Sequence, residues 1–128
     1  MEYHIAKELG QCELPGRAIR KCVGMDGKIH SEEMSFGRTM FAPKYGIMQP
    51  HHHAEEIIYV LDTKKGYVKF GETEECLGGR VDLKPDMVLH FADQEWHAFC
   101  FEEEDGYADI LFFYSQVDNL RPEENPGK

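Results

Sequence analysis

A succession of short strand-like runs, separated by turn residues, is the feature that most limits how this chain can fold. The runs are rich in β-branched and aromatic residues or alternate between apolar and polar ones, and no long amphipathic helix interrupts them. They predict strands at residues 17–23, 35–41, 56–62, 67–70, 81–83, 87–91, 96–101 and 107–115. Eight or nine short strands at regular spacing are typical of an all-β sandwich or barrel. Residues 63–66, with their glycine, predict a hairpin loop.

Length and charge narrow the class of protein. The 128 residues suit one domain, and the net charge of −10 opposes binding to the phosphate backbone of nucleic acids. The longest apolar runs have five residues, whereas a membrane-spanning helix needs about 20. The first residues lack the pattern of a signal peptide, so we expect a cytoplasmic protein. Its four cysteines form no C-x-x-C pair, which favours reduced thiols.

Histidine is the unusual component of the sequence: there are seven, and three are consecutive at residues 51–53. Residues two apart in a strand point to the same face, so His51 and His53 project together and His52 projects oppositely. If Ala54 and Glu55 form a tight connection, His53 and Glu56 become a cross-strand pair with Cβ atoms about 5 Å apart. Two imidazoles and a carboxylate together can hold a divalent metal.

Two other interpretations of this segment stay open. A three-residue loop would pair His52 with Glu56 and would leave Pro50 in place of one ligand. A solvated loop of histidine and glutamate would need no metal at all. The apolar run that follows at residues 57–61 favours a structured site at the start of a buried strand.

The segment from Gly46 to Glu56 resembles the first motif of the cupins, G-x5-H-x-H-x3-4-E-x6-G. Residues 15–17 are similar to the opening of small cupin domains, and residues 83–86 are similar to their L-x-P-G-D turn. His97 lies twelve residues after Pro85, as the histidine of the second cupin motif should. The resemblance covers roughly residues 14–116. It divides the chain into an N-terminal extension (1–13), a cupin β-barrel (14–116) and an irregular C-terminal tail (117–128).

The resemblance implies a single-domain jelly-roll β-barrel that forms a homodimer. It also implies one metal ion, held by His51, His53, Glu56 and His97. Because this donor set has imidazole and carboxylate but no thiolate, it suits Fe, Mn, Ni, Co or Zn. Glu56 follows His53 after two residues, where the family has three or four, so His52 stays an alternative inward-facing ligand.

Several side chains could orient a substrate or transfer a proton in such a barrel: Arg38, Tyr45, Gln49, Tyr107, Asp109 and Tyr114. Arg38 could clamp a carboxylate, although a surface salt bridge is the commoner role of such a residue. The site predicts a metal-dependent enzyme that acts on a small sugar acid or keto acid through isomerase, lyase or decarboxylase chemistry. The alternatives are a cupin that binds a small molecule without turnover and an Fe(II)-dependent dioxygenase.

Overall fold

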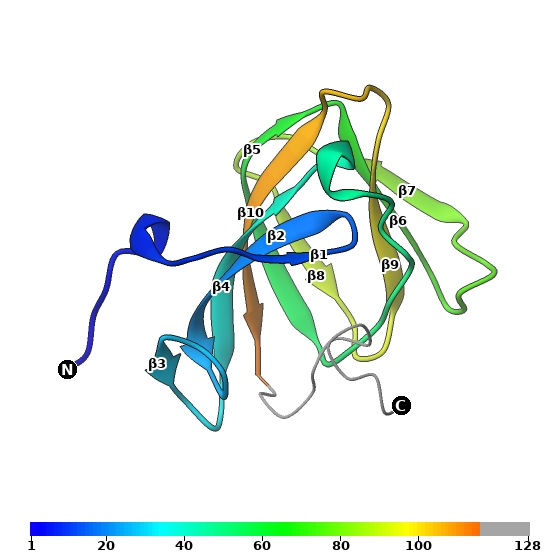
Figure 1. The fold of residues 1–128 in the computed structure, drawn as a ribbon. Helices are drawn as coiled ribbons and strands as arrows, with labels where there is room; N and C mark the ends of the chain where they lie inside the picture. Colours follow the sequence, from blue (N-terminus) through cyan, green and yellow to red (C-terminus); the bar gives the residue numbers. More distant parts are fainter. Residues whose placement is uncertain (116–128) are drawn as a thin grey trace.

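Two sheets face each other and enclose the interior of the protein (Figure 1). The computed structural model describes residues 1–115. The large sheet runs in the order β1 (Cys12–Leu14), β2 (Arg17–Gly24), β4 (Ser35–Phe41), β10 (Tyr107–Tyr114), β5 (Glu56–Lys64) and β8 (Val88–Phe91), with β3 (Ile29–His30) beside β2. The small sheet runs in the order β7 (Gly79–Asp82), β6 (Gly66–Gly71) and β9 (Trp96–Phe101). Apart from β3, neighbouring strands are antiparallel.

This arrangement confirms the predicted all-β jelly-roll. Each of the eight predicted runs forms a strand, with ends that differ by one or two residues. The two strands that the sequence does not reveal are β1, with three residues, and β3, with two. Both are too short for an alternating pattern to appear, and pairing with β2 holds each of them in place.

The predicted hairpin at residues 63–66 is wrong, because β5 and β6 belong to different sheets. Thr63 and Lys64 continue β5 by pairing with Ala108 and Tyr107 of β10. Lys65 alone, with a φ of 56°, turns the chain from the large sheet into the small one. The turn therefore forms a corner of the barrel.

Alternation along the strands determines which side chains enter the interior. In β5, Ile58 and Val60 point inward and are almost fully buried, while Ile57 and Tyr59 point outward. Ile110 and Phe112 of the neighbouring β10 pair with Val60 and Ile58 and lie beside them on the same inner face. Glu56 lies two residues before Ile58, so the same alternation places its carboxylate inside the barrel.

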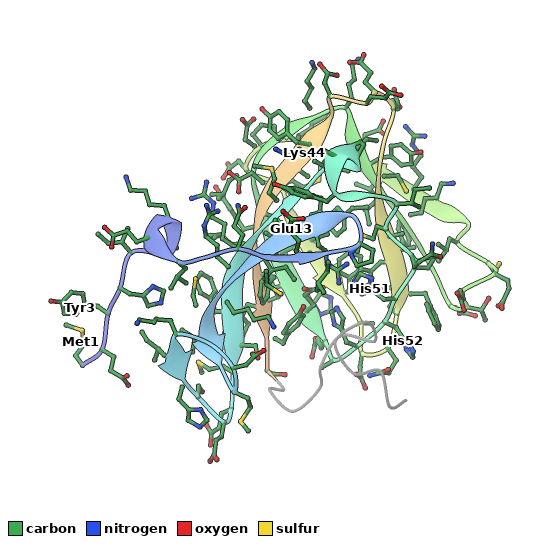
Figure 2. The ribbon with its side chains drawn as sticks, viewed as in Figure 1. Met1, Tyr3, Glu13, Lys44, His51 and His52 are labelled. Carbon is green, nitrogen blue, oxygen red and sulfur yellow. The ribbon has the colours of Figure 1, made fainter. Side chains whose placement is uncertain are left out.

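The N-terminal segment lies outside this core. The N-terminal segment carries the short 3-10 helix η1 (Ala6–Glu8), and Figure 2 shows Met1 and Tyr3 away from the barrel. A second 3-10 helix, η2 (Pro43–Tyr45), follows β4. Within residues 1–115, neither helix has the length or apolar character to cross a membrane. The predicted tail at residues 117–128 lies outside the described residues.

Gly16 brings the loop after β4 against the start of β2. Its φ is +84°, and a Cβ added there would lie 2.6 Å from the Cβ of Met48. We therefore expect Gly16→Ala to lower the free energy of unfolding by about 1–3 kcal/mol, through backbone strain and the clash together. Denaturant unfolding measures this change. Gly10→Ala is the matched control, since a Cβ at Gly10 meets nothing within 4 Å, and an equal loss in both variants would contradict the prediction.

Candidate metal centre

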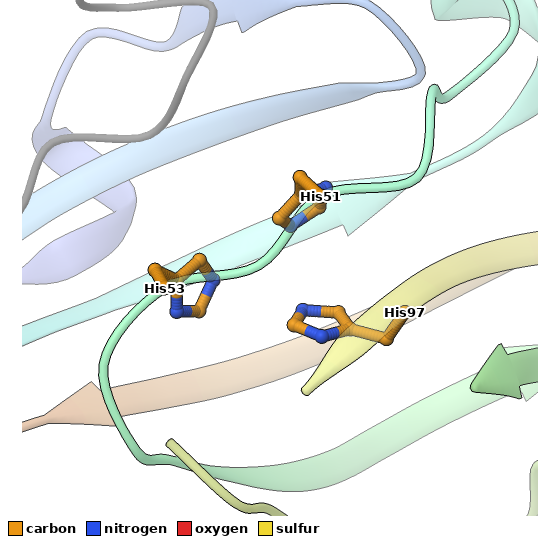
Figure 3. Close-up of side chains that lie close together, drawn as sticks. All are labelled: His51, His53 and His97. Atoms are coloured by element: carbon orange, nitrogen blue, oxygen red, sulfur yellow. The ribbon is translucent and has the colours of Figure 1, made fainter. Parts of the chain in front are cut away.

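Three buried histidines from two segments of the chain point toward one another. His51 and His53 lie in the segment before β5, and His97 lies on β9 (Figure 3). Each offers one ring nitrogen to a group whose ligand atoms all lie within 4.8 Å of one another. Among residues 1–115, this is the cluster of histidine, cysteine and carboxylate side chains able to hold a metal.

Backbone pairing explains why these histidines meet. The His51 N–H donates to the His97 carbonyl at 3.1 Å, and the His97 N–H donates to the His51 carbonyl at 3.0 Å. The segment is also held at its other end, where the Gln94 N–H donates to the His53 carbonyl at 2.8 Å. With this register His51 and His53 face inward. His52 faces the other way and stacks on Trp96, with ring centroids 4.1 Å apart.

Glu56 completes the group from the large sheet. Its Oε1 lies 3.5 Å from the Nε2 of His53 and 3.5 Å from the Nε2 of His97. The expected cross-strand pairing of His53 with Glu56 is wrong, because the segment at residues 51–53 lies beside β9. Glu56 instead pairs with Phe91 of β8 and Tyr114 of β10. The side chains meet across the gap between the two sheets.

The second ring nitrogen of each histidine faces a backbone carbonyl. Nδ1 lies 3.3 Å from the Gln49 oxygen in His51, 3.1 Å from the Ala54 oxygen in His53, and 3.0 Å from the Glu95 oxygen in His97. A carbonyl oxygen can only accept a hydrogen bond, so each Nδ1 carries the proton. In the neutral imidazole, Nε2 then presents its lone pair.

Burial keeps these imidazoles neutral. It lowers the pKa of His51 well below its ordinary value of 6.5, and the nearby His97 ring and Arg17 guanidinium lower it further. Burial also lowers the pKa of His97 to about 4, with a further lowering by the charge of Arg17. Near neutral pH these two side chains are therefore unprotonated, as metal coordination requires.

The donor chemistry of the cluster fits a divalent metal. Unprotonated imidazole nitrogens and a carboxylate oxygen converge in a buried space, which concentrates electron-rich atoms away from water. Hydrogen bonds from the far nitrogen of each ring to the backbone fix the ring orientation, as outer-shell partners do in metal sites. The residues that would hold the ion are His51, His53, Glu56 and His97.

Comparison with known proteins identifies the fold. No family model and no curated protein matches the sequence. Among solved structures, the polyketide cyclase RemF from Streptomyces resistomycificus is 20% identical, with a TM-score of 0.70 over 95% of this chain and 82% of that one. A cupin-like protein from Thermotoga maritima is 16% identical, with a TM-score of 0.58 over 82% of this chain and 72% of that one. The chain has the cupin fold.

A longer protein, an enzyme, is also similar to this chain in structure. The oxalate decarboxylase from Lactobacillus farciminis, solved as a formate complex, is 14% identical, with a TM-score of 0.68 over 94% of this chain. The present chain spans only 35% of that protein. At these identities the likeness concerns the fold, and the neighbours that share it include enzymes.

The interior of this barrel contains further polar groups. A cavity of about 10 Å³ lies among His51, Glu56 and His97. The guanidinium-bearing Arg17 and the hydroxyl-bearing Thr39 and Tyr114 also line it, and all three residues are buried. Tyr114 is among the side chains predicted from the sequence, whereas Arg17 and Thr39 are not. Arg17 lies two residues before the fully buried Ile19, and that spacing is the signal that could have placed it inside.

The other five side chains predicted to orient a substrate lie elsewhere. Arg38 is on the outer face of β4, where its Nε and Nη2 donate to the Asp109 carboxylate at 2.9 and 2.6 Å. Tyr45 lies on η2 beneath the Lys44 ammonium, and the side chain of Gln49 is exposed. Tyr107 donates its hydroxyl to Asp62 at 2.7 Å on the surface. The structure brings none of these side chains to the lining of the histidine cavity.

Proposed function

We propose that this cupin binds one divalent transition metal through His51, His53, Glu56 and His97 and acts as a metal-dependent enzyme on a small oxygenated organic acid. Sugar acids and keto acids are the substrate classes considered, and the reaction is of the isomerase, lyase or decarboxylase type. The ion would polarise a carbonyl oxygen of the substrate as a Lewis acid. Iron, manganese, nickel, cobalt and zinc all suit the donor set.

One observation supports the metal above all others. Each of the three histidines donates its Nδ1–H to a backbone carbonyl, so three Nε2 lone pairs converge beside one carboxylate. A histidine that only fills a core needs no such shared orientation. Three identical orientations in one cavity are what a metal site requires.

The charges around the cavity favour an acid as the substrate. Glu56 and Arg17 line the same cavity and carry opposite charges, while burial keeps His51 and His97 neutral. A divalent ion would therefore leave the cavity with a net positive charge in a protein whose overall charge is −10. A small anion entering the cavity would meet the Arg17 guanidinium, which suits carboxylates. The oxalate decarboxylase with this fold was solved with such an anion, formate.

The remaining polar side chains have positions suited to orienting a bound acid. Thr39 and Tyr114 reach the cavity from β4 and β10 and present hydroxyl groups, which can donate or accept a hydrogen bond. Phe41, Phe99 and Phe112 form apolar walls that exclude water. These side chains can thus hydrogen-bond to one oxygen atom of an acid at the metal and shield that atom from solvent.

The size of the cavity favours a second candidate, a cupin that holds its metal and binds a ligand without turnover. The enclosed volume of about 10 Å³ has room for about one water molecule. Closed metal sites are typical of structural ions, whereas catalytic sites keep a position open. Measurement of turnover separates the two functions.

Metal binding is the first test. We expect the untagged protein to bind one divalent ion per chain, as measured by elemental analysis and calorimetry. His97→Gln should weaken binding by more than the roughly 10–100-fold that the loss of an outer-shell partner costs. His30→Ala is the control, because His30 is exposed and distant from the cluster. A metal-replete preparation with clearly less than one ion per chain would overturn the proposal.

Turnover is the second test. Metal-loaded protein incubated with panels of keto acids and sugar acids should convert at least one of them, followed by NMR of substrate and product. Conversion should disappear after chelation and in Glu56→Gln, and it should persist in His30→Ala. Binding of an acid with no conversion in any panel would favour the non-catalytic candidate.

We further propose that the protein is a cytoplasmic homodimer whose barrel spans residues 14–116. Support for the dimer comes from the outer face of the large sheet, where Phe113 pairs with Ile57 and Tyr59 pairs with Val88. All four side chains are between 37% and 64% exposed. Arg38 and Asp109 beside this face form an ion pair, so these two charges together do not add to the repulsion between two acidic copies.

Light scattering coupled to gel filtration tests the dimer. We expect twice the chain mass for the wild type and one chain mass for Val88→Lys, because a charge buried at an apolar contact is costly. Met25→Lys is the matched control, since Met25 is exposed at a distant turn. A monomeric wild type would contradict this assignment.

A further inference from the structure

The first five residues carry large apolar side chains that face solvent. Met1, Tyr3 and Ile5 occupy alternate positions; Met1 is fully exposed, and the other two are 83% and 53% exposed. Residues 1–5 belong to no helix or strand of the structure, and Figure 2 shows Met1 and Tyr3 away from the barrel. We call residues 1–5 the arm. Single exposed apolar side chains are common, whereas the arm presents three of them at alternate positions, as one face of an extended chain does.

The arm is attached to the barrel by its polar side. The Nε2 of His4 lies 3.2 Å from the carbonyl oxygen of Cys22 on β2, and it donates the hydrogen bond because a carbonyl oxygen can only accept. His4 is half-buried, whereas its neighbours Tyr3 and Ile5 are exposed. This is the reverse of the usual arrangement, in which apolar side chains turn toward the protein. The arm is therefore held in an orientation that leaves its apolar side chains available to another surface.

The chain has a second uncovered apolar surface, on the outer face of the large sheet. It consists of Ile57, Tyr59, Val88 and Phe113, and we call these four side chains the sheet face. In Figure 1 the arm extends from the large sheet on the side away from the small sheet, which is also the side of this outer face. The two apolar surfaces thus belong to the same side of the molecule.

The arm does not cover the sheet face of its own chain, since the side chains of both stay exposed. His4 holds the arm at β2, whereas β5 lies three strands away in the order β2, β4, β10, β5. That separation is about 14 Å at the usual spacing of neighbouring strands. A second copy of the chain supplies a matching apolar surface for each arm without any change in the fold.

The sheet face alone is small for a stable dimer. A stable interface buries roughly 800 Å² on each partner. A fully buried aromatic side chain contributes roughly 150–250 Å², and the four side chains of the sheet face are only 37–64% exposed. Their combined area therefore falls short of that requirement. Tyr3 and Ile5 of each arm add apolar surface of the same kind.

We propose that Tyr3 and Ile5 of each chain pack on the sheet face of a second copy, and that this contact completes the dimer. The assignment rests on the proposed dimer and names the segment that holds it together. Because the arm and the sheet face lie on the same side of the molecule, a two-fold axis lets each arm cover the sheet face of the other copy. Both arms are then buried, and the assembly closes at two chains.

Removal of the apolar side chains of the arm tests this contact. Tyr3→Ser combined with Ile5→Ser should raise the dissociation constant of the dimer at least about tenfold, because each dimer loses the burial of four large side chains. Analytical ultracentrifugation over a range of chain concentrations measures this constant. Ile47→Ser is the matched control, since Ile47 is as exposed as Tyr3, at 83%, and lies outside both the arm and the sheet face. All three positions are exposed, so these changes do not endanger folding.

A photo-reactive benzophenone side chain in place of Tyr3 locates the arm on the other copy. Protein that carries this group is mixed with isotopically heavy wild-type protein, and cross-linked peptides are identified by mass spectrometry. We expect light peptides of the arm joined to heavy peptides from β5, β8 or β10. Cross-links to heavy peptides from other strands only, or a dimer that gives no heavy cross-links, would overturn the assignment.

Failure of this assignment is distinguishable from failure of the proposed dimer. A wild type that stays monomeric over the whole concentration range overturns the dimer, and the arm contact with it. A wild-type dimer whose dissociation constant is unchanged by Tyr3→Ser with Ile5→Ser, or is raised equally by Ile47→Ser, overturns the arm contact alone. The dimer and the metal site would then stand without it.

Discussion

The reciprocal backbone hydrogen bonds between His51 and His97 are the contact on which the rest of the site depends. They attach a segment with no other strand character to the end of the small sheet, and they set its register. Because the side-chain period of an extended chain is two, a slip by one residue would turn His52 inward and His51 and His53 outward. The stacking of His52 on Trp96 and the hydrogen bond from Gln94 to the His53 carbonyl both act against that slip.

Packing and electrostatics act together in this interior. Burial of a charged side chain is costly because the charge loses its hydration, and Glu56 and Arg17 both lie almost entirely away from water. The same sheet that buries Glu56 supplies Ile58, Val60 and Ile110, whose packing stabilises the barrel and can offset that cost. Apolar packing therefore accounts for the burial of the strands that position the charged groups, and these strands would be buried even if the charged groups were absent. The polar cavity stays small because aromatic rings fill the space around it.

The sequence was most informative where a pattern is local. The β-branched and aromatic runs at residues 56–62 and 107–115 indicated strands, and the two-residue spacing of His51 and His53 placed them on one face. His97 could be predicted as a ligand only from the family resemblance, because no local pattern around it indicates that it lies close to residue 51. Arg17 was missed since its inward position depends on the register of β2 with β4. The loop at residues 63–66 has the composition of a hairpin, yet local turn chemistry does not specify which strand the chain joins next.

The stacking of His52 on Trp96 has a practical consequence. Trp96 is the single tryptophan of the chain, and it is bonded directly to His97 while its ring lies against the neighbour of His51 and His53. Its intrinsic fluorescence therefore arises at the edge of the histidine cluster and from no other place in the protein. The protein carries its own optical reporter, and events at the cluster can be followed in the native chain without a label.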